Sequence, residues 1–245
     1  KPSAFKNEGG LVEDLIRNWL EILPKLVPKY SELKERIKNT HRMGVGRLLC
    51  DLNKNRYKYL SSEEVVRGLY RGINNEKEYD LLPDAFLSHE QNLRKEILEK
   101  LLADAGIDNA WTWIEKHRTI TNFVEEINEL ISYRNDAAHG AIIDEFLGLN
   151  ELLELCDFVE SSCQAIAELV TYKTIKYQEK IGQASKVGEI TEWFKNPKAG
   201  VAKFDKEKVT LSVGDTFFLI NENISWCQLV TIESIKISEC EPLEN

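Results

Sequence analysis

The chain has 245 residues, of which 42% are hydrophobic and 30% are charged, and its formal net charge is −9. This length suits one large domain, or a medium domain followed by a small one, and the composition is ordinary for a globular protein. No apolar run is long enough to span a bilayer, and the N-terminus lacks the layout of a signal peptide. We therefore expect a cytoplasmic protein without a membrane partner. The acidic balance also argues against a protein that coats nucleic acid through bulk charge.

The cysteines are odd in number and scattered, and no two have the Cys-x2-Cys spacing of a zinc site: Cys50, Cys156, Cys163, Cys227 and Cys240. We expect reduced thiols and no disulfide framework. No metal-binding constellation or Gly-rich phosphate loop stands out, so we expect neither a metal nor a cofactor.

Helical spacing of apolar residues dominates the chain up to about Gly182. We expect helices over 11–23, from 28 through the following basic segment, over 61–72, over 88–103, over 122–140 and over 152–182. Pro24 is expected to end the first helix, and Ser61-Ser-Glu-Glu resembles a capping sequence at the start of the third. The last helix carries an apolar stripe that is either core or a dimer seam: Leu152, Cys156, Val159, Cys163, Ile166 and Val170.

From Lys186 onward the pattern becomes typical of β-strands separated by turn residues. Five short strands are expected, over 189–194, 200–204, 208–213, 216–220 and 226–237. Because so small an open sheet would expose its edges, we expect a closed barrel. The predicted fold is therefore α+β in two parts, with an all-α helical bundle over residues 1–183 and a small β-barrel accessory domain over residues 184–245.

A local excess of positive charge lies in residues 25–58, which hold ten Lys or Arg and three acidic residues. Such a run is either a solvated helix face or a track for phosphates near an active site. Lys38, Arg42 and Arg47 are its candidate substrate-binding residues.

The candidate for chemistry is the pair Arg134 and His139. The spacing alone is weak evidence, because Arg36 and His41 share it. The first pair differs in following an amphipathic helix and in having polar and small neighbours: Asn135, Asp136, Ala137, Ala138 and Gly140. Small residues allow close approach of another helix or a substrate, and glycine allows a sharp turn.

The segment Ser132-Tyr-Arg-Asn-Asp-Ala-Ala-His-Gly140 resembles the signature of HEPN domains, and its Arg-Asn and Ala-His-Gly are close to the prokaryotic RiboL-PSP-HEPN subgroup. In layout the resemblance covers roughly residues 10–182, although this short segment carries it specifically. The resemblance implies that Arg134 and His139 are catalytic and that Asn135 is an auxiliary polar residue. It also implies a homodimer in which the two motifs face each other across a two-fold axis.

These residue types suit cleavage of RNA without a metal ion. Histidine can act as a base or an acid near neutral pH, and arginine stabilises negative charge that builds on phosphate oxygens. One chain supplies one such histidine, whereas a symmetric dimer supplies both an acid and a base. Attack by the 2′-hydroxyl leaves a 2′,3′-cyclic phosphate, so DNA is expected to be inert.

A structural role is the alternative for this segment, with Arg134 paired to Asp136 or Asp144 and His139 capping the helix. Tyr133 is either core or a residue that stacks on substrate, and Asp136 is a further candidate substrate contact. We expect a metal-independent endoribonuclease, by resemblance a toxin or antiphage defence effector, with RNA as substrate and a regulatory protein as a further partner. The rival reading is a non-catalytic HEPN module or scaffold that partners a nucleotidyltransferase or RNA.

The predicted strands resemble the second-domain barrel of translation elongation factors, through Gly188-Glu-Ile-Thr-Glu-Trp-Phe, Gly200-Val-Ala, Leu211-Ser-Val-Gly-Asp-Thr-Phe and Val230-Thr-Ile-Glu-Ser-Ile-Lys-Ile. This resemblance implies an accessory binding module and not a second active site. Since the segment holds seven Lys against ten acidic residues, contact with protein or positioning of RNA by shape is expected rather than phosphate neutralisation.

Overall fold

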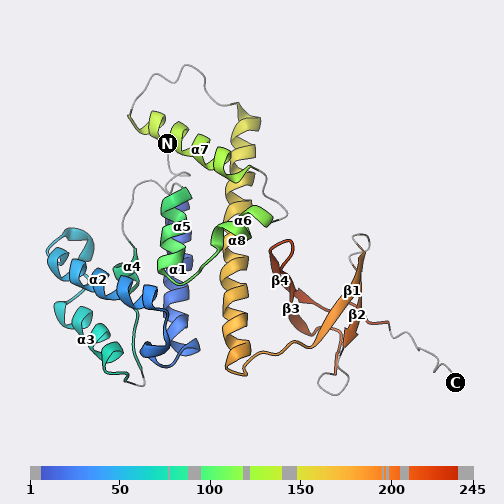
Figure 1. Cartoon of the computed structure of the whole chain (residues 1–245). Helices are drawn as coiled ribbons and strands as arrows, with labels where there is room; N and C mark the ends of the chain where they lie inside the picture. Colours follow the sequence, from blue (N-terminus) through green and yellow to red (C-terminus); the bar gives the residue numbers. More distant parts are fainter. Residues whose placement is uncertain are drawn as a thin grey trace.

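The computed structural model describes residues 7–76, 78–87, 95–117, 122–139, 148–194, 196, 199–204 and 210–236. Within them a helical bundle comes first and two small hairpins follow (Figure 1). The helices are α1 (Asn7–Leu26), α2 (Glu35–Asp51), α3 (Ser62–Ile73), α4 (Pro83–Phe86), α5 (Lys95–Asp104), α6 (Ala110–Lys116), α7 (Phe123–His139) and α8 (Leu149–Lys180), with 3-10 turns η1 (Tyr30–Glu32) and η2 (Asn55–Tyr57). The strands are β1 (Gly188–Phe194), β2 (Ala199–Phe204), β3 (Thr216–Asn221) and β4 (Trp226–Thr231).

This order of helices and then strands confirms the predicted fold class. α3 begins at the predicted cap, where the Ser61 hydroxyl accepts from the Glu64 N–H and the Glu64 carboxylate accepts from the Ser61 N–H. The predicted end of the first helix at Pro24 was wrong, because α1 continues to Leu26. Pro24 lies in the last turn, so α1 ends only two residues beyond the backbone bond that this proline cannot donate. The helix predicted over 88–103 is described only from Lys95.

The bundle is built around α1, whose apolar face is buried: Ile16, Trp19, Leu20 and Leu23. α8 packs along α1, and the rings of Trp19 and Tyr177 lie 5.9 Å apart between centroids. The Trp19 indole N–H donates to the Ala105 carbonyl at 2.8 Å, which ties α1 to the end of α5. Each such buried large side chain contributes about 1.5–3 kcal/mol, so α1 holds the bundle together.

A buried polar cluster links α2 to the segment that precedes α4. His41 is fully buried, and its ring stacks on that of Phe86 at 5.8 Å. Its Nε2 accepts from the Leu82 N–H at 3.5 Å, so the neutral ring carries its proton on Nδ1, 3.2 Å from the Tyr30 hydroxyl. Burial lowers the pKa of His41 to about 4, because little water remains to solvate an imidazolium, and the charge of Arg42 lowers it further.

The β part consists of two antiparallel hairpins, and the predicted closed barrel is not found among the described residues. The registers run from Gly188↔Phe204 to Phe194↔Ala199 and from Thr216↔Thr231 to Asn221↔Trp226. A barrel needs a continuous ladder of strands, and the predicted third strand does not form over 210–213, while 208–209 lie outside the described residues. The hairpins meet instead through the rings of Trp193 and Trp226, at 6.3 Å between centroids.

A buried carboxylate on α8 joins the hairpin β3–β4 to the bundle. Glu168 is only 5% exposed, and its Oε2 accepts from the Cys227 backbone N–H at 2.9 Å. Its Oε1 accepts from the side chains of Gln228 at 2.8 Å and Gln164 at 2.9 Å. The Nε2 of His117, just after α6, lies 3.5 Å from Oε2. Because a buried carboxylate is stable only when donors surround it, this cluster fixes the hairpin against α8.

Replacing Glu168 with Ala is expected to loosen the hairpin, because the buried Cys227 N–H would lose its acceptor. The expected loss is about 2–4 kcal/mol in the free energy of unfolding, with faster proteolysis of the segment that links α8 to β1. Thermal melts and limited proteolysis would measure both effects. The control is Glu160→Ala, an exposed residue on the same helix. Equal protease resistance in the two variants would contradict this account of the joint.

The pKa of His41 predicts that acid destabilises the fold. The unfolded chain takes up this proton near pH 6.5 and the folded chain only near pH 4. The stability that the neutral ring provides is therefore complete above about pH 6.5 and is lost as the pH falls towards 4, by about 3 kcal/mol. Denaturant melts across this range should show a shallower pH dependence for His41→Gln than for the wild type. Identical slopes would rule out this role for His41.

Candidate functional site

The predicted motif lies on the last two turns of α7. The first turn of this helix is anchored, because the ring of Phe123 lies 5.0 Å from Trp111 on α6 and 5.3 Å from Phe158 on α8, between centroids. Ile127 and Leu130 continue the buried face. Beyond Leu130 the helix extends away from α8 (Figure 1), with Ile131 still packed against the core.

The backbone of α7 fixes how the motif positions are spaced. Arg134 and His139 are five residues apart, about 140° around the helix and about 7.5 Å along it. Asn135 lies one turn before His139, on the same side of the helix. Asn135 and Tyr133 are half-buried. The side chains of Arg134, Asp136 and His139 and the whole of Asp144 lie outside the described residues, so both the catalytic and the structural reading of the motif stay predictions.

The second pair with the same spacing has a structural role. Arg36 is exposed and its Nε donates to Asp104 of α5 at 2.8 Å. His41 is fully buried in the cluster with Tyr30 and Phe86. A substrate cannot reach the two side chains together, so the spacing marks no site on α2.

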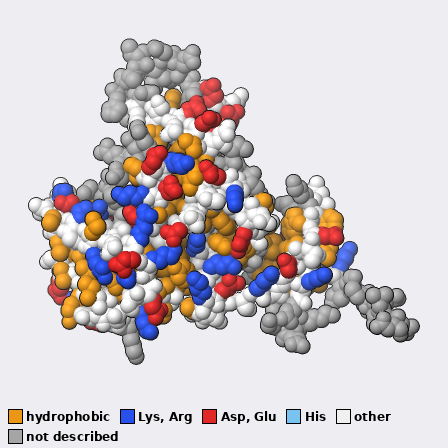
Figure 2. Space-filling model, viewed as in Figure 1, with side chains coloured by type: hydrophobic (Ala, Val, Ile, Leu, Met, Phe, Trp, Pro, Cys, Tyr) orange, Lys and Arg blue, Asp and Glu red, His pale blue; other side chains and the backbone are white. Residues whose placement is uncertain are grey.

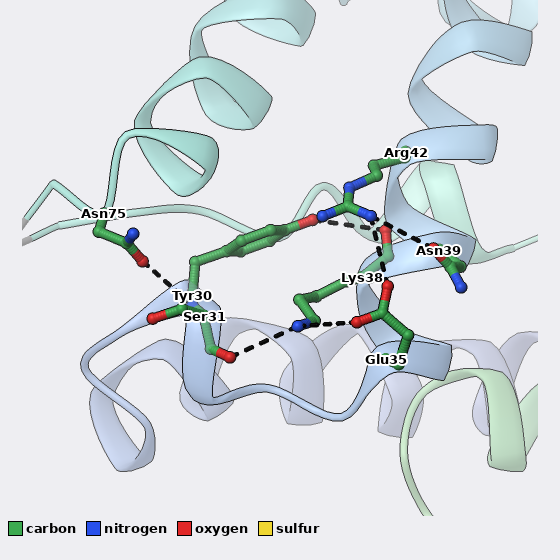
Figure 3. Close-up of polar contacts among 7 residues, drawn as sticks. All are labelled: Tyr30, Ser31, Glu35, Lys38, Asn39, Arg42 and Asn75. Carbon is green, nitrogen blue, oxygen red and sulfur yellow. Dashed lines mark hydrogen bonds and ion pairs between the residues drawn. The ribbon is translucent and has the colours of Figure 1, made fainter.

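The three cations proposed as substrate contacts all have partners within the chain. Lys38 lies 2.9 Å from Glu35, which also pairs with Arg42 at 3.4 Å (Figure 3). Arg47 donates through Nη2 to three carbonyl oxygens at the end of α4, at 2.9 Å from Asp84, 3.4 Å from Ala85 and 3.2 Å from Leu87. Arg47 therefore stabilises the helix terminus of α4. Phosphate binding by these three residues stays a prediction.

One polar cluster had no counterpart in the sequence reasoning, namely Glu168 with His117. The His117 side chain is completely buried beside Glu168, although its sequence context is polar. The available signal was a charged residue inside the apolar stripe of α8, between Ile166 and Leu169. Such a residue is rare in a core unless it is paired.

The described residues hold no group of three or more His, Cys, Asp or Glu that could bind a metal ion. Within the same ranges no helix is both long and apolar enough to cross a membrane. Cys50, Cys156, Cys163 and Cys227 are free thiols, and Cys240 lies outside the described residues. Burial raises the pKa of Cys227 to about 12, so this thiol stays protonated and serves packing.

Comparison with protein families gives a match to this chain. The family model described as RiboL-PSP-HEPN matches residues 10–172, from α1 into the second half of α8, and this range includes the Arg134–His139 segment. It ends before the hairpins, and the resemblance of those hairpins to the elongation-factor barrel is not confirmed. Neither the curated proteins nor the solved structures give a match. Because the family model covers well over half of the sequence, the chain belongs to the RiboL-PSP-HEPN family.

Proposed function

We propose that the protein is a metal-independent endoribonuclease whose active site is composed of the Arg134–His139 segments of two copies. The observation that carries the proposal is the family match over the motif, joined to the position of that motif in the last two turns of a helix whose first turn packs against α6 and α8. The second R-x4-H pair is excluded by the burial of His41, so one candidate pair remains. We further propose a cytoplasmic defence or toxin role under the control of a protein partner.

The chemistry follows from the residue types. One His139 removes the proton of the 2′-hydroxyl, the oxygen attacks the adjacent phosphorus, and the bond to the 5′-oxygen breaks. The His139 of the second copy protonates that leaving oxygen. Both Arg134 guanidinium groups donate to the phosphate oxygens as negative charge builds, and Asn135 holds the substrate or the histidine in place. The products are a 2′,3′-cyclic phosphate and a free 5′-hydroxyl.

The first turns of α8 support the dimer. Leu149 is 74% exposed and Leu153 is 53% exposed, and Cys156 continues them at helical spacing. Further along the same helix Ile166 and Leu169 are buried in the core. Of the apolar stripe expected from the sequence, Ile166 is core and Cys156 is exposed, and Leu149 and Leu153 extend the exposed apolar surface that a second copy could cover.

The catalytic prediction is that Arg134→Ala and His139→Ala each lower RNA cleavage at least about 100-fold, since each removes a group that acts on the transition state. Cleavage would be measured in EDTA with end-labelled RNA, and the product tested for a 2′,3′-cyclic phosphate. Arg36→Ala is the matched control and should keep wild-type activity. Equal activity in all of these variants would leave a binding module as the better reading.

The dimer prediction concerns Leu149 and Leu153. Changing both to Glu places charges in the proposed seam and is expected to give monomers that keep the wild-type melting temperature and lose RNA cleavage. Light scattering after gel filtration would measure the mass. Val66→Glu is the control, since Val66 is 48% exposed on α3. A fully active monomer would refute the composite site without refuting ribonuclease activity.

A further inference from the structure

One face of α8 changes from apolar to cationic along the helix. The buried positions Ile166 and Leu169 are continued, at intervals of four and three residues, by Lys173, Lys176 and Lys180. Residues at these intervals lie on one side of a helix, and each turn advances about 5.4 Å. The three lysines therefore form a row along the end of α8 that adjoins the hairpins. In Figure 2, Lys and Arg side chains recur across the lower half of the visible face, with Asp and Glu between them.

The row carries more positive charge than its carboxylate partners balance. Lys176 lies 3.1 Å from Glu179 and 3.6 Å from Glu222. Lys173 and Lys180 form no ion pair with another residue of the described ranges. This differs from the basic run of α2, where Lys38 and Arg42 already share a carboxylate.

The surroundings of Lys173 disfavour its positive charge. Burial lowers the pKa of Lys173, and the nearby charges of Lys34 and Lys180 lower it further, against the opposite effect of Asp108 and Glu222. Half-buried cations that repel one another are stabilised when a polyanion binds, because its negative charges offset that repulsion.

Aromatic rings lie beneath these lysines. The Nζ of Lys176 is 5.7 Å from the ring centroid of Tyr172, and the Nζ of Lys180 is 5.2 Å from that of Tyr177. Tyr172 in turn stacks on Trp113 at 4.9 Å with an interplanar angle of 25°, so it is held from below. These rings pack against the core, so their contacts with the ammonium groups hold the lysines in place along the surface.

We propose that Lys173, Lys176 and Lys180 bind backbone phosphates of single-stranded RNA that extends away from the catalytic motif, an inference that rests on the proposed ribonuclease function. Phe158, where the first turn of α7 meets α8, lies fifteen residues before Lys173, or about 22 Å along α8, and Arg134 lies eleven residues, or about 16 Å, further along α7. An RNA must therefore be several nucleotides long to reach both the motif and the row. Short substrates should be cleaved without using it.

The test measures binding of a labelled oligouridylate, longer than the ~4–16 nucleotides that one single-stranded site covers, to His139→Ala protein that cannot turn it over. Adding K173Q and K180Q is expected to weaken binding about tenfold and to reduce the slope of log K against log salt by about 1.4, or about 0.7 per lost phosphate contact. The matched control is R67Q with K100Q, which removes two exposed cations elsewhere on the surface, on α3 and α5, and should change the affinity less than about twofold.

Two further variants test whether a loss of binding comes from misfolding rather than from the lost charges. K173R with K180R keeps both charges and should restore binding, and K180Q alone changes only an exposed residue and should weaken binding about threefold. Unchanged affinity in the double Gln variant, or an equal loss in the R67Q and K100Q control, would overturn the proposal.

Cleavage assays distinguish a failure of the lysine row from a failure of the proposed ribonuclease activity. K173Q with K180Q should raise KM for the long RNA and leave cleavage of a five-nucleotide RNA unchanged. If the wild type cleaves no RNA but the binding loss remains, the ribonuclease proposal fails and the lysine row stands. If RNA is cleaved and the affinity is unchanged, the lysine row alone fails.

Discussion

The burial of the Glu168 carboxylate is the constraint on which the arrangement of the molecule depends. A carboxylate taken out of water costs several kcal/mol unless donors replace the lost hydration. Here the donors come from β4 and from α8 itself, with His117 after α6 alongside. No one of these elements satisfies the carboxylate alone, so they are stable only together. The hairpin β3–β4 is for this reason part of the folded body.

α8 connects three regions with different surroundings. Its 32 residues extend about 48 Å, from exposed leucines at its start, through the core, to the lysines beside the hairpin. The same amphipathic helix therefore supplies the candidate dimer seam, the packing against α1 and a cationic surface. A continuous helix also fixes orientation, which means that α7 at one end and β4 at the other have a defined relation.

Local patterns predicted the local features of the fold. The apolar periods of α1 and α8, the cap at Ser61 and the change from helices to strands were all visible in the sequence. The prediction of a closed barrel was wrong, because the closure of strands into a barrel depends on contacts between hairpins. The acceptors of Arg47 lie 37 to 40 residues away, and the Cys227 donor to Glu168 lies 59 residues away, so no local pattern encodes them.

For the candidate site, too, local features could be predicted from the sequence and long-range contacts could not. The motif was found from composition and spacing, and its place at the end of a helix could be predicted. The burial of His41 in the core could not be predicted, because it arises from Phe86 and Tyr30 in other segments. Pairing of two motifs depends on a second molecule, and periodicity within one chain indicates only that an exposed apolar stripe exists.

Glu168 and Phe158 also set a rule for the length of α8. Between them the helix must present one side chain to α7 and another to β4 in fixed angular phase. Inserting a single residue there would rotate everything beyond it by about 100° and turn the carboxylate away from its donors. An insertion close to a whole number of turns, such as about seven or eleven residues, would keep the angular phase but would move the two positions about 10 to 16 Å further apart. The number of residues between these two positions therefore fixes the register of α8 against both α7 and β4, so this interval does not tolerate a change in length.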